Sequence, residues 1–195
     1  IAADGNVADA HLALALMAVE SGAARRAEAE FRTTLTLWPQ SLKARLLFAK
    51  FLIKNDRKTE ALNELDSASA ASAIAPAVLL DLGRAYWAVD QRAAAERLLR
   101  QAVARAPRLW QAQESLGILL LECGRRREAE VFLRLALDSS RGGADLSAYH
   151  LAQLCRRSGR LGEWRLLRAT LERRSPGLAA RLRGAGSSVL RPALL

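Results

Sequence analysis

The chain has 195 residues, of which 51% are hydrophobic and 26% are charged, and its formal net charge at pH 7 is +10. This apolar content excludes a largely disordered chain, because it is enough to bury the interior of a domain. The apolar residues are mainly Ala and Leu, and only 5% of all residues are aromatic, which is typical of helices rather than strands. The expected fold class is all-α.

No stretch reaches the roughly 18 consecutive apolar residues that a membrane span needs, so no membrane span is expected. Cys123 and Cys155 are too few for a disulfide framework and lack metal-ligand spacing with histidine. The sequence therefore predicts no metal and no cofactor, and it leaves open whether the two thiols pair. Because the chain begins at Ile1 rather than Met, we interpret it as a mature form or an excised piece, and cytoplasm and periplasm both remain open as compartments.

A spacing of 34 residues recurs along the chain. Pro39 lies twelve residues after Ala27, and Pro107 lies twelve residues after Ala95, so the two prolines are 68 residues apart, or twice 34. The same spacing continues into the later part of the chain, with one extra residue near Gly142. In chain order, this register predicts a leading segment at 1–7, repeats near 8–41, 42–75, 76–109, 110–144 and 145–176, and a capping helix with a flexible tail over 177–195.

The third repeat shows the pattern most completely. It has a large–small pair, an aromatic residue, spaced alanines and a closing proline, at Leu82, Gly83, Tyr86, Ala95, Leu99, Ala102 and Pro107. This pattern resembles the tetratricopeptide repeat, a helix-turn-helix unit of 34 residues. The resemblance covers residues 8 to 176 and implies an all-α, right-handed superhelical solenoid of about five such repeats. Some repeats depart from the pattern: Ala15 and Ala18 stand at the Gly and Tyr places of the first, and Trp164 replaces the usual Ala of the fifth.

Small residues mark the expected helix crossings. In the third repeat, Gly83 and Ala95 would let the two helices approach closely, because a small side chain leaves room for the neighbouring helix. The turn between the paired helices suits a left-handed residue that ends the first helix. The residues at that place are Gly22, Asp56, Asp90, Gly124 and Gly159.

The resemblance also implies that the first helix of each repeat lines an inner, concave groove, where outward side chains are available to a partner. At these positions apolar side chains form a trail with basic side chains beside it. The expected groove residues are Leu12, Leu16, Leu46, Lys50, Lys54, Leu80, Arg84, Trp87, Ile118, Leu121, Arg156 and Arg157. A rotation of the helix by one residue would place any one of these leucines in the core instead.

The expected function is a non-catalytic protein–protein interaction scaffold that binds a partner segment in this groove. A large exposed apolar surface usually marks an interaction site, and the lysines beside the trail favour an acidic, amphipathic protein or peptide as the partner. The alternative is a bacterial component of cell-envelope assembly, secretion or polysaccharide export. The bias toward Ala and Arg suggests a GC-rich bacterial genome, and the resemblance associates such arrays with those processes.

Catalysis and nucleic-acid binding are less favoured. His11 and His150 lie in distant repeats and lack the partners of a triad or dyad, so both are interpreted as surface or packing residues. Much of the positive charge lies between Arg156 and Arg191, where it could contact phosphate or another anionic surface. Because GC-rich coding also produces many arginines, nucleic acid is the less favoured partner.

The C-terminal stretch "VLRPALL" is apolar and follows the linker sequence "GAGSS". One hypothesis is that residues 190–195 imitate a ligand and occupy a groove, either in the same molecule or between copies, which would cause self-association. Pro192 supports this hypothesis because it disfavours a helical conformation at Arg191. The other reading is a disordered tail, since chain ends are commonly mobile.

Overall fold

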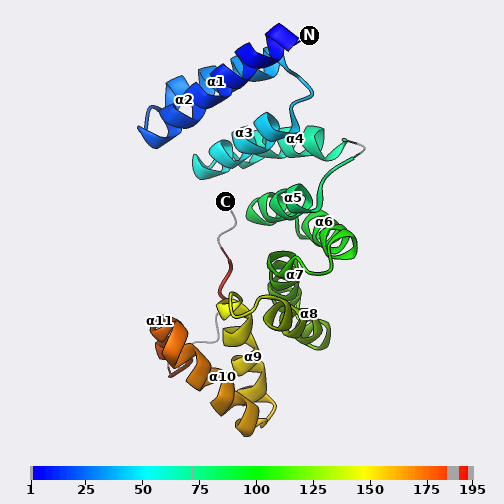
Figure 1. The fold of residues 1–195 in the computed structure, drawn as a ribbon, viewed down its shortest axis with the longest axis vertical. Helices are drawn as coiled ribbons and strands as arrows, with labels where there is room; N and C mark the ends of the chain where they lie inside the picture. The colour runs from blue at the N-terminus through cyan, green and yellow to red at the C-terminus, as the bar shows by residue number, and fades with distance from the viewer. Residues whose placement is uncertain (1, 72, 184–188, 193–195) are drawn as a thin grey trace. The chain divides into compact units, whose positions relative to one another are not determined.

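The computed structural model describes residues 2–71, 73–183 and 189–192, and these form eleven helices and no strand (Figure 1). The all-α expectation is therefore confirmed. The helices are α1 (Ala2–Glu20), α2 (Ala24–Leu37), α3 (Leu42–Lys54), α4 (Lys58–Ser69), α5 (Pro76–Ala88), α6 (Arg92–Arg105), α7 (Trp110–Glu122), α8 (Arg126–Ser139), α9 (Asp145–Arg157), α10 (Leu161–Arg174) and α11 (Pro176–Arg183). Helix α1 includes residues 2–7, which the repeat register assigns to a leading segment. Within the described residues, no helix has both the length and the apolar character that a membrane crossing requires.

Consecutive helices pair into hairpins through short turns that contain a left-handed residue. The φ angle at this place is 75° at Gly22, 59° at Asp56, 62° at Asp90, 77° at Gly124 and 75° at Gly159. Glycine reaches such angles without strain, and a short polar residue tolerates them. The next residue donates its backbone N–H to a carbonyl five residues earlier, which closes the helix end. These bonds are Ala23 to Ala18, Arg57 to Leu52, Gln91 to Tyr86, Arg125 to Leu120 and Arg160 to Cys155. The expected turn residues are confirmed.

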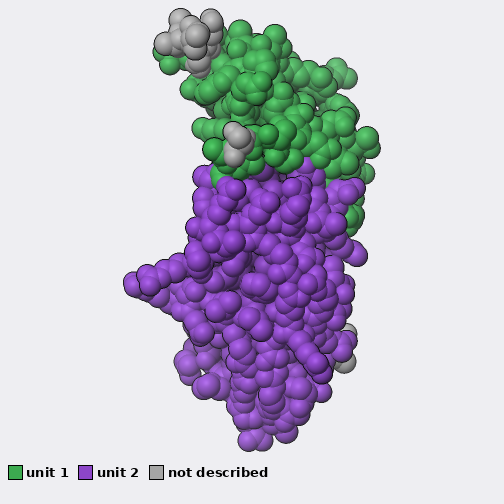
Figure 2. Space-filling model, turned by 90° about the vertical axis from the view of Figure 1, so that its right-hand side faces the viewer, with its two compact units in different colours: residues 1–74, 88–90, 195 green, residues 75–87, 91–194 purple. Residues whose placement is uncertain are grey.

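The chain divides into two compact units, which are coloured separately in Figure 2. Unit 1 contains α1 to α4, and unit 2 contains residues 76–87 of α5 together with α6 to α11. The interior of unit 1 is organised by three aromatic rings from α2 and α3. The ring centroid of Phe31 lies 5.3 Å from that of Phe48 and 5.7 Å from that of Phe51. Such offset packing of aromatic rings stabilises a core beyond the area that it buries.

In unit 2, glycines on the first helices allow close crossings with the second helices. A Cβ atom added at Gly83 of α5 would lie 2.9 Å from Leu99 Cγ of α6, and one added at Gly117 of α7 would lie 2.8 Å from Leu133 Cγ of α8. Ala95, on the α6 side of the first crossing, is fully buried. The expectation that Gly83 and Ala95 are contact points between helices is therefore confirmed, because neither helix could keep its place against a larger side chain.

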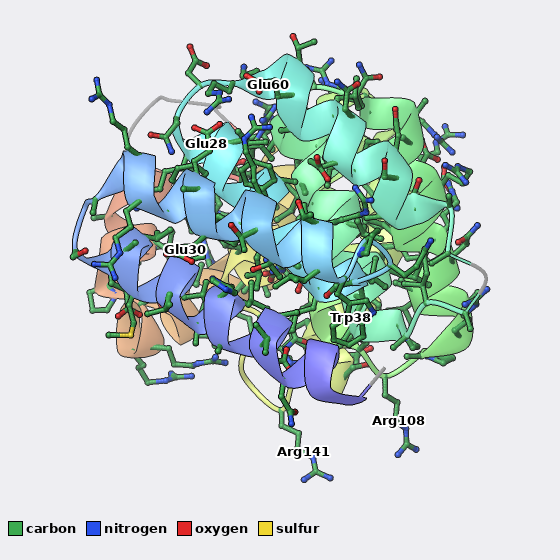
Figure 3. All side chains as sticks on the ribbon, turned by 90° about the horizontal axis from the view of Figure 1, so that it is seen from above. Glu28, Glu30, Trp38, Glu60, Arg108 and Arg141 are labelled. Carbon is green, nitrogen blue, oxygen red and sulfur yellow. The ribbon has the colours of Figure 1, made fainter. Side chains whose placement is uncertain are left out.

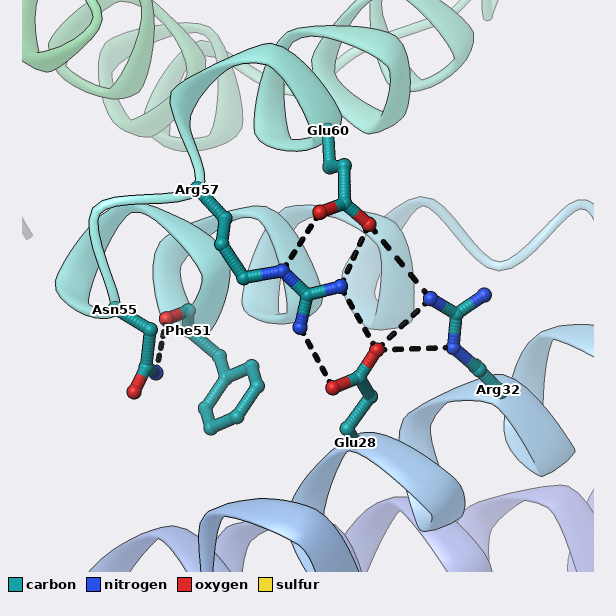
Figure 4. Close-up of polar contacts among 6 residues, drawn as sticks. All are labelled: Glu28, Arg32, Phe51, Asn55, Arg57 and Glu60. Atoms are coloured by element: carbon teal, nitrogen blue, oxygen red, sulfur yellow. Dashed lines mark hydrogen bonds and ion pairs between the residues drawn. The ribbon is translucent and has the colours of Figure 1, made fainter.

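Ion pairs connect successive second helices. In unit 1, Arg57 precedes α4 and donates both to Glu60 on α4, at 2.6 Å, and to Glu28 on α2, also at 2.6 Å (Figure 4). Arg32 donates to the same Glu28 carboxylate. The hydrogen bond from Arg57, followed by that from Arg32, lowers the pKa of Glu28 to about 2, so Glu28 is ionised at neutral pH.

The same arrangement recurs in unit 2. Arg125 precedes α8 and pairs with Glu96 on α6 and Glu128 on α8. Arg160 precedes α10 and pairs with Glu130 on α8 and Glu163 on α10. Each of these arginines thus joins its own helix to the preceding second helix through charge-assisted hydrogen bonds. The pattern is absent between α4 and α6, because the equivalent positions hold uncharged residues. These are Leu62 in α4, Gln91 just before α6 and Ala94 in α6.

Helix α11 packs against α9 and α10 and buries Ala179 and Leu182. Helix α11 lies at the start of the segment 177–195, for which a capping helix and a tail are expected, and it begins one residue earlier, at Pro176. Arg156 of α9 donates a hydrogen bond to the Leu182 carbonyl oxygen at 2.8 Å, which satisfies one of the carbonyl groups left without a partner at the end of a helix. The linker at 184–188 and the last residues, 193–195, lie outside the described residues.

Candidate functional site

Residues 189–192, which we call the tail segment, lie on the first helices of unit 2 (Figure 1). The segment is not helical. Its Leu190 carbonyl oxygen is 2.8 Å from Nε2 of His150 on α9. The Arg191 guanidinium meets the carboxylate of Glu122 at the end of α7, with Nε to Oε1 at 2.5 Å and Nη2 to Oε2 at 2.9 Å. The tail segment therefore bridges two helices that are far from it in sequence.

The Arg191 guanidinium also stacks on the indole ring of Trp87 in α5, with Cζ 5.2 Å from the ring centroid. The same indole donates its Nε1–H to Glu122 Oε2 at 2.9 Å. Trp87 therefore orients the carboxylate and covers one face of the cation that the carboxylate binds. The Glu122 side chain is only 12% exposed, so its attraction to a cation is weakly screened by water. Trp87, Glu122 and His150 are called the α5–α7–α9 site below.

His150 is buried, with 1% of its surface exposed. Burial is the largest influence on the imidazole and lowers its pKa, and the hydrogen bond with the Leu190 carbonyl opposes that shift. The ring is thus neutral at pH 7. A carbonyl oxygen can only accept a hydrogen bond, so the neutral ring carries its proton on Nε2 and donates it to Leu190. Nδ1 is buried and has no hydrogen-bond partner among the described residues.

A pocket of about 230 Å³ adjoins the tail segment. Its lining combines apolar, polar and basic side chains, and Val189 of the tail segment is one of them. The full lining is Leu121, Glu122, Gly124, Arg126, His150, Gln153, Leu154, Arg157 and Val189. The site therefore offers an apolar recess next to its charged contact, which is the mixture that recognises short peptide segments.

Deeper in unit 2, polar contacts fix the helices that carry the site. Glu114 of α7 accepts hydrogen bonds from the Ser147 backbone N–H at 3.0 Å and the Ser147 hydroxyl at 2.8 Å, at the start of α9. Burial raises the pKa of Glu114, and these two bonds oppose that shift. Arg84 of α5 donates to the Ser115 hydroxyl at 2.9 Å. These bonds join α5 to α7 and α7 to α9, so they help to set the spacing of the three site residues.

Unit 1 has a larger, mainly apolar pocket of about 450 Å³ between α1, α2 and α3. Two lysines stand at its edge. The lining is Leu16, Val19, Phe31, Leu47, Lys50, Phe51 and Lys54. Its described lining includes the rings of Phe31 and Phe51 but no carboxylate, whereas the α5–α7–α9 site includes Glu122, so the two units offer different chemistry to a partner.

The structure places the expected groove residues in three ways. Lys54, Arg156 and Arg157 are exposed, and Leu16, Lys50, Arg84 and Leu121 are half-buried. Five apolar members are buried instead, namely Leu12, Leu46, Leu80, Trp87 and Ile118. The expectation of a continuous, exposed apolar trail is therefore wrong for these five positions. These side chains are packed in the interior instead, and at Trp87 the Arg191 guanidinium of the tail segment also covers the ring.

Glu122 and His150 do not belong to the expected trail. Glu122 stands at the end of α7, beside the expected groove residue Leu121, but the expected set contains only apolar and basic residues and leaves this acid out. His150 is expected only as a surface or packing residue, and it is buried as the packing reading requires, while it also contacts the tail segment. Cys123 is exposed and Cys155 is buried, and both are free thiols. The sequence signal that could have indicated the site is the presence of an acidic residue, Glu122, on a first helix together with the basic Arg191 in the C-terminal tail.

A family model described as tetratricopeptide repeat matches residues 18–73. Three solved structures are similar over most of the chain. One is a structure from the functional characterization of Pseudomonas aeruginosa pilF. It is 20% identical in sequence, the match covers 94% of this chain and 80% of that chain, and the TM-score is 0.75. PilW, described as a widely conserved type IV pilus biogenesis factor, is 18% identical, with 91% and 83% covered and a TM-score of 0.74.

The third structure, YrrB, is described as a TPR protein with an unusual peptide-binding site, and it is 18% identical, with 89% of this chain and 90% of that chain covered and a TM-score of 0.68. No curated protein matches the chain. The helix-turn-helix pairs, the left-handed turns and the small residues at the crossings are those expected of this repeat. Residues 18–73 therefore match the tetratricopeptide repeat family, and the fold over most of the chain is that of solved structures such as YrrB, a TPR protein.

Proposed function

We propose that the chain is a non-catalytic scaffold that binds a segment of a partner protein on the inner side of its first helices. The observation that carries the proposal is the tail segment, because it already occupies such a surface with a backbone contact, a charged contact and an apolar contact. A surface that binds one non-helical segment in this way is suited to bind another of the same chemistry.

The two pockets favour different parts of a partner. The pocket of unit 1 is apolar with Lys50 and Lys54 at its edge, which suits an acidic, amphipathic segment. The α5–α7–α9 site presents a carboxylate, which suits a basic one. We therefore propose an acidic partner segment for the pocket of unit 1 only.

Nucleic-acid binding is the less favoured alternative. Several arginines at the second helices pair with glutamates, as Arg57, Arg125 and Arg160 do at the helix starts, so their charge is already neutralised locally. Arg108 and Arg141 do project away from the helices (Figure 3), but they are isolated on loops and do not form a basic stripe. Binding to nucleic acid normally requires such a stripe.

A role in cell-envelope assembly is the second candidate function. It is favoured by the similarity to PilW, which is described as a type IV pilus biogenesis factor. At 18% identity this similarity supports a shared fold. We therefore state the role of this chain only as a proposal. A pilus or secretion component would be expected to bind its neighbours through the same two pockets.

Site-specific cross-linking tests the proposed function. A photo-reactive amino acid would replace Lys54, in the unit 1 pocket, or Arg157, in the unit 2 pocket, and as a control Arg108, on an exposed loop. We expect one partner protein to be captured in the source cell at residue 54 or 157 and not at 108, and the purified partner to bind the purified chain. If residues 54 and 157 capture nothing beyond the control, the scaffold proposal is wrong.

A further inference from the structure

Building on the proposed function, we infer that the α5–α7–α9 site recognises its partner through an arginine side chain, and that the tail segment is the chain's own competing copy of that partner motif. The motif has an apolar residue two places before the arginine and a proline directly after it, as in Val189, Arg191 and Pro192. The inference rests on four contacts between the tail segment and the site.

The first contact selects arginine over lysine. Glu122 offers both carboxylate oxygens, and they meet two guanidinium nitrogens at 2.5 and 2.9 Å. Only the planar fork of arginine can form this paired contact, whereas an ammonium group is a single point of charge. Glu122 is also nearly enclosed, so without a cation its charge would be poorly compensated. The site is therefore incomplete unless an arginine is present.

The second contact comes from Trp87. Its ring face lies 5.2 Å from the Arg191 Cζ, which is within the range of an attractive cation–π interaction. Its Nε1–H holds Glu122 in place at 2.9 Å, so the carboxylate is oriented before a ligand arrives. A site prepared in this way loses less freedom on binding than a flexible one.

The third contact recognises the backbone of the bound segment. His150 donates from Nε2 to the carbonyl of the residue before the arginine. A hydrogen bond to a backbone carbonyl can form with any side chain at that position, so this contact does not select for leucine at residue 190. It does require a non-helical backbone whose carbonyl is free, and the proline after the arginine favours such a conformation.

The fourth contact is apolar. Val189 lines the pocket that also includes Leu121 and Leu154, and Pro192 on the other side of the arginine is buried. A proline has no backbone N–H, so its burial leaves no donor without a partner. The flanking residues therefore add affinity through buried apolar area, while the arginine sets the specificity.

Because the tail segment belongs to the same chain, it competes with an added partner at a high effective concentration. A partner with the same motif must displace it. Weakening the binding of the tail segment to the α5–α7–α9 site should therefore raise the affinity of the chain for a partner added in solution. This expectation gives the inference a direct test.

The probe is a fluorescent peptide with the sequence of residues 189–195, VLRPALL, titrated with the full chain while fluorescence anisotropy is measured. The wild-type chain should bind it weakly because its own tail segment occupies the site. Arg191→Glu places a negative charge against Glu122 and should expel the tail segment, so this variant should bind the peptide about tenfold more tightly or better. Arg191→Ala serves as a second variant with the same expected direction, and the circular dichroism of both should match the wild type.

The specificity is tested in the Arg191→Glu chain. Adding Glu122→Gln should weaken peptide binding by about tenfold or more, because a hydrogen-bonded charge pair is lost. Adding Glu20→Gln, an exposed glutamate of unit 1, should change nothing. Peptides with lysine or alanine in place of the arginine should bind more weakly than VLRPALL, and alanine most weakly.

The outcomes separate the inference from the proposed function. If the peptide binds the Arg191→Glu chain but Glu122→Gln and the alanine peptide change nothing, the site binds segments without reading arginine, and the inference is wrong while the scaffold proposal stands. If no variant binds the peptide, the inference is also wrong, and the scaffold proposal is judged by the cross-linking at residues 54 and 157 alone.

Discussion

Replacing Trp87 with alanine is expected to lower the free energy of unfolding by about 3–5 kcal/mol, the usual cost of removing a large buried aromatic side chain. The indole is 0% exposed, and its Nε1–H satisfies the partly enclosed carboxylate of Glu122. The variant would leave a cavity and would remove one of the hydrogen-bond donors to Glu122. Urea denaturation followed by circular dichroism measures the loss.

Trp38→Ala provides the matched control, since Trp38 is 44% exposed in the turn after α2. It should change the free energy of unfolding by no more than about 1 kcal/mol, because truncations at exposed sites have small effects. An equally small loss for Trp87→Ala would mean that the indole stands on the groove surface, as the repeat pattern predicts, rather than in the interior.

Gly117→Ala is expected to destabilise the chain by about 1–3 kcal/mol through overpacking. The added methyl group would meet Leu133 Cγ at 2.8 Å and the Leu133 backbone nitrogen at 3.2 Å. A backbone atom cannot move aside as a flexible side chain can, so α7 and α8 would have to separate. This crossing holds α7, which ends at Glu122, so weaker binding of a partner at that site should accompany the loss of stability.

The control for this prediction is Gly162→Ala in α10. A Cβ atom there meets nothing within 4 Å, and alanine is favoured over glycine in a helix, by less in the first turn, where Gly162 lies, than the ~1 kcal/mol of a helix interior. The same substitution is therefore expected to stabilise the chain at one position and destabilise it at the other. If both substitutions stabilised it, the close α7–α8 crossing would be wrong.

The fold follows from the sequence because its determinants are local. The turns at Gly22 and Asp56, the crossing at Gly83 and the closing Pro107 all act within one repeat of 34 residues, and the spacing repeats them along the chain. A periodic pattern of this kind predicts which helices pair and where each one ends. The structure agrees with it at each of these positions.

The candidate site is harder to predict, for two physical reasons. A rotation of one residue decides whether an apolar side chain lines a groove or a core, and the repeat pattern does not fix that angle, as Leu80 and Ile118 show. The charged contact joins Glu122 to Arg191, which are 69 residues apart. Periodicity carries no information about where a non-repeating tail docks, so this pairing emerges only from the three-dimensional structure.

The most direct test of the account is whether the tail segment lies on the α5–α7–α9 site in solution. A nuclear Overhauser spectrum of the isotope-labelled full chain measures this through the protons of Arg191 and of the Trp87 indole. Stacking at 5.2 Å predicts cross-peaks between the Arg191 side chain and the Trp87 ring, and Arg191 resonances shifted upfield by the ring current. Arg191 resonances at random-coil positions, without cross-peaks to Trp87, would contradict the account.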